Sequence, residues 1–178
     1  EILAAGVETL TEHKEEVDDL NVFPVPDGDT GTNMSLTFQA ALREAEKASD
    51  KVPDILELAA QGALMGARGN SGVIVSQFFR GFAKVGKAEK LGIPEITKGI
   101  NGASSLAYQA VRKPVEGTIL TVVREAGEKA TKIQAKETDL ISFMEKIYKH
   151  ADNILEKTPE MLPTLKQAGV VDAGGKGV

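Results

Sequence analysis

The fold class of this chain depends on one segment, Gly72-Val73-Ile74-Val75-Ser76-Gln77-Phe78-Phe79. Its β-branched and aromatic residues would suit a buried strand. Four apolar residues in and beyond it nevertheless recur at helical spacing: Ile74, Phe78, Phe82 and Val85. No neighbouring segment alternates between apolar and polar residues, as a partner strand would. We therefore predict a helix over residues 71–86.

Helical spacing of apolar residues also dominates the rest of the chain. Pro53, Pro94 and Pro159 stand where first helical turns are expected, and each is followed by an acidic residue. We expect Thr158 to cap the last helix. The sequence predicts about eight helices, near residues 2–19, 33–48, 53–67, 71–86, 94–112, 118–134, 138–156 and 159–168. Because their connections are short, we expect an antiparallel, up-and-down arrangement in one all-α domain.

The composition excludes several classes of function. The 178 residues include 21 Lys and Arg against 26 Asp and Glu, a formal net charge of −5, which disfavours binding to nucleic acid or to an anionic membrane surface. Cysteine is absent, so disulfides, thiol nucleophiles and Cys-ligated metals are excluded. His13 and His150 lie far apart among charged residues, and we expect both to be solvated. A metal ion here should therefore be a hard, oxygen-ligated one. With no apolar run of membrane-spanning length, we expect a cytoplasmic protein.

The segment Asn21-Val22-Phe23-Pro24-Val25-Pro26-Asp27-Gly28-Asp29-Thr30-Gly31-Thr32-Asn33-Met34 departs from the helical pattern. Asp27 and Asp29 flank a glycine, so their carboxylates can converge on one cation or on two adjacent ones. The polar residues Thr30, Thr32 and Asn33 lead from this pair into a helix N-terminus, where an anion is favoured. Asp-Gly-Asp alone is more typical of an ordinary turn than of a metal site. An EF-hand does not fit, because its glycine and glutamate positions would hold a threonine and a phenylalanine.

Three further segments are rich in glycine and oxygen-bearing side chains. They are Gly66-Ala67-Arg68-Gly69-Asn70-Ser71-Gly72, Pro114-Val115-Glu116-Gly117-Thr118-Ile119-Leu120 and Gly169-Val170-Val171-Asp172-Ala173-Gly174-Gly175. Each is compatible with an interhelical turn, and Arg68 could contact phosphate or solvent. In an up-and-down bundle, however, all three fall at the same end as the Asp27 segment. A shared rim of this kind is what a nucleotide site on a helical bundle requires.

These four segments, in this order, resemble the Dak2 family, the dihydroxyacetone kinase L-type domain. The resemblance covers essentially the whole chain and is closest to the N-terminal ATP-binding domain of bacterial fatty acid kinase A subunits. It implies one domain over residues 1–178 that forms an eight-helix antiparallel barrel with the nucleotide at one rim. Because the chain begins at Glu1 and ends within a glycine-rich turn, we expect this domain to belong to a longer protein.

The resemblance also implies the site residues. Asp27 and Asp29 would be the catalytic pair that holds one or two Mg²⁺ ions, with Asn21 as a weaker metal ligand. ATP would be bound by further residues: Thr30, Thr32, Asn33, Asn70, Ser71 and Gly72 around the phosphates, and Gly117, Thr118 and Asp172 around the nucleoside. The dihydroxyacetone kinase pattern has an aspartate where Asn21 stands and a histidine where Thr30 stands. Both departures favour the fatty acid branch.

The implied activity is phosphoryl transfer from Mg·ATP to a fatty acid, giving an acyl phosphate for phospholipid synthesis. A separate fatty-acid-binding B subunit of the DegV type would present the acyl chain, with no nucleic acid partner and no membrane insertion. The isolated domain would bind ATP and show little turnover. Two alternatives stay open: an L subunit of a dihydroxyacetone kinase acting on a sugar acceptor, and a non-catalytic nucleotide-binding module.

Overall fold

The structure, a computed structural model, describes residues 1–86 and 88–178, and over these residues it contains helices and no strand. The prediction of an all-α fold is confirmed, and the ambiguous segment lies within a helix, Gly69–Ala83. The helices in chain order are α1 (Ile2–Glu12), α2 (Lys14–Asp19), α3 (Thr30–Ala45), α4 (Val52–Gly66), α5 (Gly69–Ala83), α6 (Ile93–Ala110), α7 (Ile119–Ile133), α8 (Leu140–Glu156), α9 (Thr158–Met161), α10 (Pro163–Ala168) and α11 (Ala173–Lys176).

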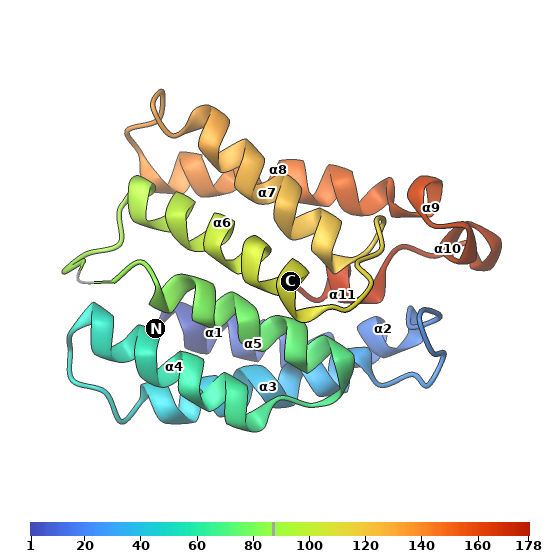
Figure 1. The fold of residues 1–178 in the computed structure, drawn as a ribbon, viewed down its shortest axis with the longest axis horizontal. Coiled ribbons are helices and arrows are strands. Elements are labelled where there is room, and N and C mark those ends of the chain that lie inside the picture. The colour runs from blue at the N-terminus through green and yellow to red at the C-terminus, as the bar shows by residue number, and fades with distance from the viewer. Residues whose placement is uncertain (87) are drawn as a thin grey trace.

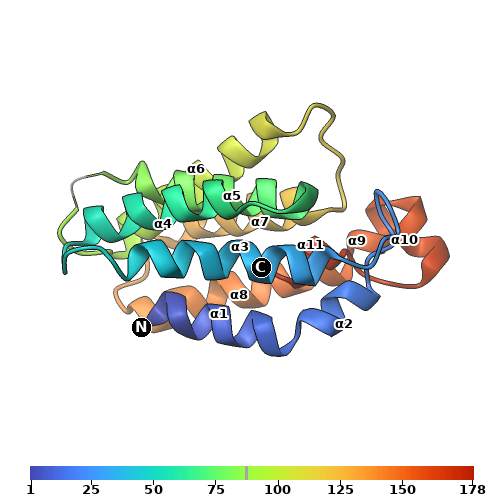
Figure 2. The same cartoon turned by 90° about the horizontal axis from the view of Figure 1, so that it is seen from below.

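The long helices pack mainly on their neighbours in the chain (Figures 1 and 2). Contacts run from α3 through α4, α5, α6 and α7 to α8, while α1 and α2 both lie on α3. The short α11 bridges α7 to α2 and α3. Over the residues that the structure describes, α8 and α1 share no extensive contact, so a closed barrel stays a prediction.

Two predicted helices are each divided in the structure. The helix expected near residues 2–19 is interrupted at His13, which leaves both α1 and α2 packed against α3. The helix expected at 159–168 is interrupted at Leu162, which is extended (φ −124°, ψ 108°). Pro163 explains the second break, because proline removes a backbone donor and disfavours helical dihedrals in the residue before it.

The C-terminal part of the chain differs from expectation in two further respects. Thr158 does not cap a helix; it is fully buried, and its hydroxyl donates to the Leu155 carbonyl (2.7 Å) and accepts from the Asp172 N–H (3.0 Å). The glycine-rich segment after α10 forms the short helix α11, whose first turn is capped by the Asp172 carboxylate. These contacts fasten the end of the described chain to α8 and α9.

The core is made of apolar side chains from the middle of the bundle. One buried cluster joins α3, α5, α6 and α7 around Met34, Val75 and Leu120. Between α3 and α4 the buried residues are alanines, which let the two helix backbones approach closely. Phe38 and Phe79 meet edge to face at 5.2 Å between ring centroids, joining α3 to α5.

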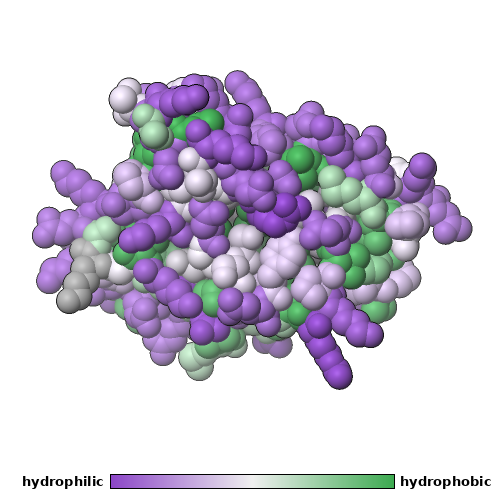
Figure 3. Space-filling model, turned by 45° about the horizontal axis from the view of Figure 1, so that its top comes forward, coloured by the Kyte–Doolittle hydropathy of each residue, from purple (hydrophilic) through white to green (hydrophobic). Residues whose placement is uncertain are grey.

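On the face shown in Figure 3, hydrophilic residues predominate, and the most extended group of apolar residues lies at the right-hand end. Among the described residues, no helix combines the length and the apolar character that a membrane span needs. An apolar cavity of about 340 Å³ lies among α5, α6, α7 and α8, and the C-terminal residues Lys176 and Val178 reach its lining. A second and larger cavity lies at the end of the bundle where the glycine-rich segments are found.

Candidate functional site

All four segments singled out in the sequence contribute to one cavity of about 570 Å³. This volume is within the range of small-molecule binding sites. The lining residues come from the Asp27 segment (Asn21, Phe23, Pro24, Val25, Asp27, Asp29, Thr30), the start of α5 (Gly69, Asn70, Ser71, Val73, Ile74), the connection into α7 (Ala110, Val111, Arg112, Lys113, Val115, Thr118, Ile119, Leu120) and the start of α11 (Asp172, Gly174). The expected shared rim is therefore present.

Three long helices begin at this cavity. Thr30 starts α3, Gly69 starts α5, and Thr118 is the residue before α7. None of the residues that precede these helices caps its own helix with its side chain, but the Thr32 N–H of α3 donates to Asp18 and the Ile119 N–H of α7 donates to Asp172. The first N–H groups of a helix lack partners within the helix and give its N-terminus a partial positive charge. The helix starts at this cavity are therefore of the kind that can donate hydrogen bonds to phosphate oxygens.

The two carboxylates lie in the same lining, on the loop between α2 and α3. Asp27 is exposed, and its Oδ1 accepts a hydrogen bond of 2.8 Å from the amide of Asn21, which is buried. Asp29 is half-buried and precedes the first residue of α3. Gly28 between them has φ +65°, a left-handed conformation that glycine allows at low cost. Two carboxylates and one amide oxygen form a donor set suited to a hard divalent cation.

A larger metal cluster is absent from residues 1–86 and 88–178, where no group of three or more His, Asp or Glu side chains could hold an ion. The predicted pair is thus supplemented by Asn21 and not by a third acid. A magnesium ion with two carboxylate ligands keeps its remaining positions for water and phosphate oxygens. The residues present therefore fit a nucleotide-borne magnesium ion better than an all-protein cage.

Two polar residues expected at the phosphates lie outside the cavity lining. Thr32 gives both its hydroxyl and its backbone N–H to the carboxylate of Asp18, at 2.7 Å and 3.0 Å. Asn33 lies beside Gly69, with its side-chain amide against the position that a Cβ would occupy there. Neither residue is part of the cavity lining. Thr32 thus joins the start of α3 to α2, and Asn33 packs beside the start of α5.

Two glycines that were expected to bind ATP, Gly72 and Gly117, are also not part of the cavity lining. Gly72 is buried, and a Cβ at that position would press on the Thr37 hydroxyl of α3 at 2.5 Å. Gly117 has φ +81° and packs against α9. The structure therefore places Gly72 and Gly117 in close packing between elements, whereas their neighbours Ser71 and Thr118 reach the cavity.

Asp172 contributes a buried carboxyl group to the cavity lining. Its side chain accepts from the Gly175 N–H at 2.7 Å, while its own N–H donates to Thr158. Burial raises the pKa of Asp172 to about 6, although hydrogen bonds from the N–H groups of Gly175 and Ile119 act to lower it. Asp172 thereby joins the starts of α7 and α11 at one wall of the cavity.

Two cationic residues in the lining were missed by sequence reasoning. Arg112 and Lys113 follow the end of α6 and are exposed, on a different segment from the two aspartates. Arg68, the cation that the sequence did suggest, is not in the lining. The sequence feature that could have identified them is the pair of adjacent cations directly before Pro114 in a chain of net negative charge.

The sequence of this chain is similar to those of known proteins. The family model described as the DAK2 domain matches residues 24–178, which include every lining residue except Asn21 and Phe23. A Bacillus subtilis protein named YloV is 47% identical over the whole of this chain, which covers 32% of YloV. Uncharacterised proteins from Staphylococcus saprophyticus and Staphylococcus aureus are 45% and 44% identical over the whole chain, which covers 33% of each. The chain thus spans about a third of the length of these relatives.

Proposed function

This chain belongs to the DAK2 domain family, a family of kinase-related proteins, and from that membership we propose that it is the Mg·ATP-binding domain of a fatty acid kinase A subunit. In this proposal the whole enzyme transfers the γ-phosphoryl group of ATP to a fatty acid carboxylate. A separate fatty-acid-binding B subunit presents that carboxylate. We place the reaction in the cytoplasm, where ATP is available.

One observation carries the proposal: three long helix N-termini and two carboxylates line the same cavity. The N-termini of α3 and α5 supply free N–H groups for phosphate oxygens, and Asn70 and Ser71 add polar side chains. Phosphoryl transfer needs positioning and charge neutralisation from a protein more than it needs covalent chemistry. The cavity offers both.

Asp27 and Asp29 would hold the magnesium ion, which when bound neutralises charge on the transferring phosphoryl group. Asn21 can join them, since rotation of its amide would turn the oxygen from its present position toward the same ion. Gly28, with φ +65°, allows the turn of the backbone between the two aspartates. Asp29 also benefits from its place at the N-terminus of α3, where negative charge is stabilised.

The acceptor carboxylate is already ionised at neutral pH, so its oxygen can attack the γ-phosphorus without a general base. A new P–O bond forms on the carboxylate as the bond to the β-phosphate oxygen breaks, giving an acyl phosphate and ADP. Arg112 and Lys113 favour an anionic acceptor, because they place two positive charges in the cavity lining. A neutral sugar, the acceptor of the dihydroxyacetone kinase branch, would gain less from them.

Calorimetric titration of this domain with Mg·ATP tests the binding part of the proposal. We expect saturable binding, and we expect Asp27→Ala to raise the Kd at least about 100-fold. Loss of a residue that only supports a metal ligand typically has a smaller effect. The matched control is Asp19→Ala, which removes an exposed acid of α2 outside the cavity. Unchanged affinity of Asp27→Ala would contradict the assignment of the metal site.

Turnover assays separate the acceptor classes. We expect the full-length enzyme to form acyl phosphate from a fatty acid bound to its B subunit, and this domain alone to form little. Transfer to dihydroxyacetone instead would assign the chain to the sugar branch. Mg·ATP binding without turnover on either acceptor, with all partner subunits present, would indicate a nucleotide-sensing module.

A further inference from the structure

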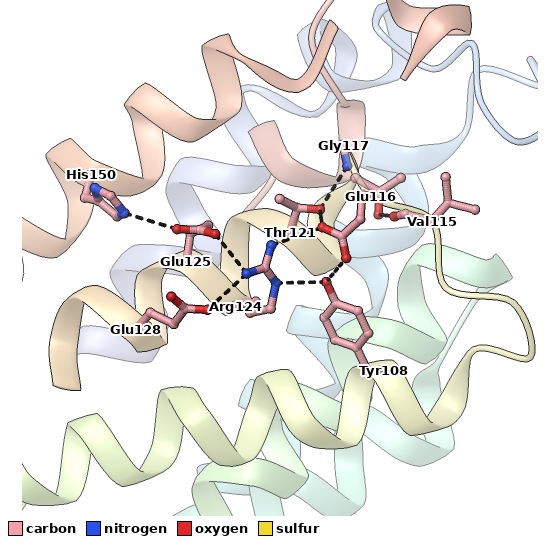
Figure 4. Close-up of polar contacts among 10 residues, drawn as sticks. Tyr108, Val115, Glu116, Gly117, Thr121, Arg124, Glu125, Glu128 and His150 are labelled. Atoms are coloured by element: carbon pink, nitrogen blue, oxygen red, sulfur yellow. Dashed lines mark hydrogen bonds and ion pairs between the residues drawn. The ribbon is translucent and has the colours of Figure 1, made fainter. Parts of the chain in front are cut away.

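The connection between α6 and α7 is tied to both helices by the carboxylate of Glu116 (Figure 4). One oxygen of Glu116 accepts a hydrogen bond of 2.9 Å from the Tyr108 hydroxyl, near the end of α6. The other accepts from the Thr121 hydroxyl at 2.7 Å and from the Arg124 guanidinium at 3.1 Å, both on α7. A single side chain therefore joins the loop to two helices.

This cluster is anchored more widely through Arg124. The guanidinium of Arg124 also contacts Glu125 at 2.9 Å and Glu128 at 3.0 Å, and Glu125 lies 3.6 Å from His150 of α8 (Figure 4). Burial of Glu116 alone would raise its pKa, but the hydrogen bonds from Thr121, Tyr108 and Arg124 outweigh it and lower the pKa. The carboxylate is consequently ionised at neutral pH, and its hydrogen bonds are charge-assisted.

One hydrogen bond joins the cluster to the turn at the cavity, and a second closes the turn itself. The Thr121 hydroxyl accepts from the backbone N–H of Gly117 at 2.9 Å, and the Thr118 hydroxyl donates to the Val115 carbonyl at 2.8 Å. Val115 and Thr118 line the cavity, whereas Glu116 between them does not. The Glu116 side chain thus acts on the backbone of its cavity-lining neighbours from outside the site.

The turn is restrained on its other side as well. A Cβ at Gly117 would lie 2.9 Å from the Met161 Cβ and 3.0 Å from both the Leu162 Cβ and the Thr158 carbonyl oxygen. The turn therefore has almost no room to move toward α9. If the hydrogen bonds to Glu116 were lost, the turn could relax only away from α9, which would change the wall of the cavity.

We propose that Glu116 is a positioning residue of the candidate site: its carboxylate holds the Val115–Thr118 turn so that Thr118 and the N-terminus of α7 face the bound nucleotide. This inference rests on the proposed function in one respect, that the ligand is Mg·ATP. It predicts that Glu116 affects nucleotide affinity without touching the nucleotide.

The test compares Glu116→Gln with Glu128→Gln. Both substitutions remove a carboxylate that pairs with Arg124, but only Glu116 lies in the loop and joins it to α6 and α7. We expect Glu116→Gln to raise the Kd for Mg·ATP about tenfold or more, as is typical when support of a binding residue is lost. We expect Glu128→Gln to leave the Kd within about twofold, and the two variants to have similar Tm values because both carboxylates are partly exposed.

Two further measurements separate positioning from general loss of stability. Amide hydrogen exchange of Gly117 in the ligand-free protein should be accelerated in Glu116→Gln and unchanged in Glu128→Gln. In a double-mutant cycle, Glu116→Gln and Thr121→Val should affect the Kd non-additively, since they break the same connection.

Equal Mg·ATP affinities of the two Gln variants would overturn the role of Glu116 and leave the nucleotide site intact. Failure of the unmodified protein to bind Mg·ATP would overturn the proposed function and, with it, this inference.

Discussion

The carboxylate of Asp18 accepts two hydrogen bonds from Thr32, one from its backbone N–H at 3.0 Å and one from its hydroxyl at 2.7 Å. Asp18 lies near the end of α2, so this pair fastens α2 to the first turn of α3. The same turn follows directly on Asp29. The carboxylate of Asp18, which does not line the cavity, therefore helps to fix the geometry of the loop that carries Asp27 and Asp29.

Removal of this support should destabilise the domain. We expect Asp18→Ala to lower the free energy of unfolding by about 2 kcal/mol, because it abolishes a charge-assisted bond and a cap-like contact to the start of α3. Urea denaturation followed by circular dichroism measures the effect. The neighbouring Asp19→Ala should change stability by less than about 0.5 kcal/mol. Equal stabilities of the two variants would show that the Asp18–Thr32 contact contributes nothing.

Substitution of Asn21 by aspartate should make stability depend on magnesium. Asn21→Asp puts a second carboxylate 2.8 Å from Asp27 Oδ1 in a buried position, where like charges repel. We expect the metal-free variant to lose about 2 kcal/mol of stability. Millimolar Mg²⁺ should raise its Tm more than that of the unmodified protein, as thermal scans with Mg²⁺ and with chelator would reveal. An identical Mg²⁺ response in both proteins would exclude Asn21 from the metal site.

The close approach of α2 and α3 depends on Gly31. A Cβ on Gly31 would overlap the carbonyl of Lys14 and contact the side chain of Val17. We expect Gly31→Ala to destabilise the protein by about 3 kcal/mol, as overpacking of a tight contact does. Gly6 of α1 is the matched control, since a Cβ there meets nothing within 4 Å, and Gly6→Ala should be neutral or stabilising. Chemical denaturation of both variants checks the difference.

Asp172 should make stability fall with rising pH. Its pKa is about 6 in the folded protein against an ordinary value of 3.8, so between these values the folded state holds more protons than the unfolded state. The contribution of Asp172 to the free energy of unfolding is fully present below about pH 4 and is lost as the pH rises through 6. The shift in pKa corresponds to a loss of about 3 kcal/mol. Unfolding free energies measured across this range should decline less steeply in Asp172→Asn. Parallel pH profiles would contradict the burial of an ionisable Asp172.

The helices were predictable because their signals are local. The spacing from Ile74 to Val85 identified a helix that composition alone would have assigned to a strand, and the structure confirms it. The prediction of one continuous helix over 159–168 was wrong. Pro163 is a local signal from which the break at Leu162 could have been predicted. The interruption at His13 has no comparable local signal, since it accompanies the packing of α2 on α3.

The shared cavity was predictable from topology, but its supporting contacts were not. An up-and-down order places alternate connections at one end, which is why four segments far apart in sequence meet. The Asp18–Thr32 pair, by contrast, joins residues 14 apart, and the partners of Glu116 lie up to eight residues before and after it. Many polar residues lie at such separations, so only the packed helices show which of them meet.

The central claim is that Asp27 and Asp29 hold a magnesium ion that carries the triphosphate of ATP into this cavity. A crystal structure with Mg²⁺ and a non-hydrolysable ATP analogue tests it most directly. We predict a metal ion about 2.1 Å from oxygens of both carboxylates, with phosphate oxygens at the N-termini of α3 and α5. A nucleotide bound elsewhere, or a metal ion with neither aspartate among its ligands, would contradict the claim.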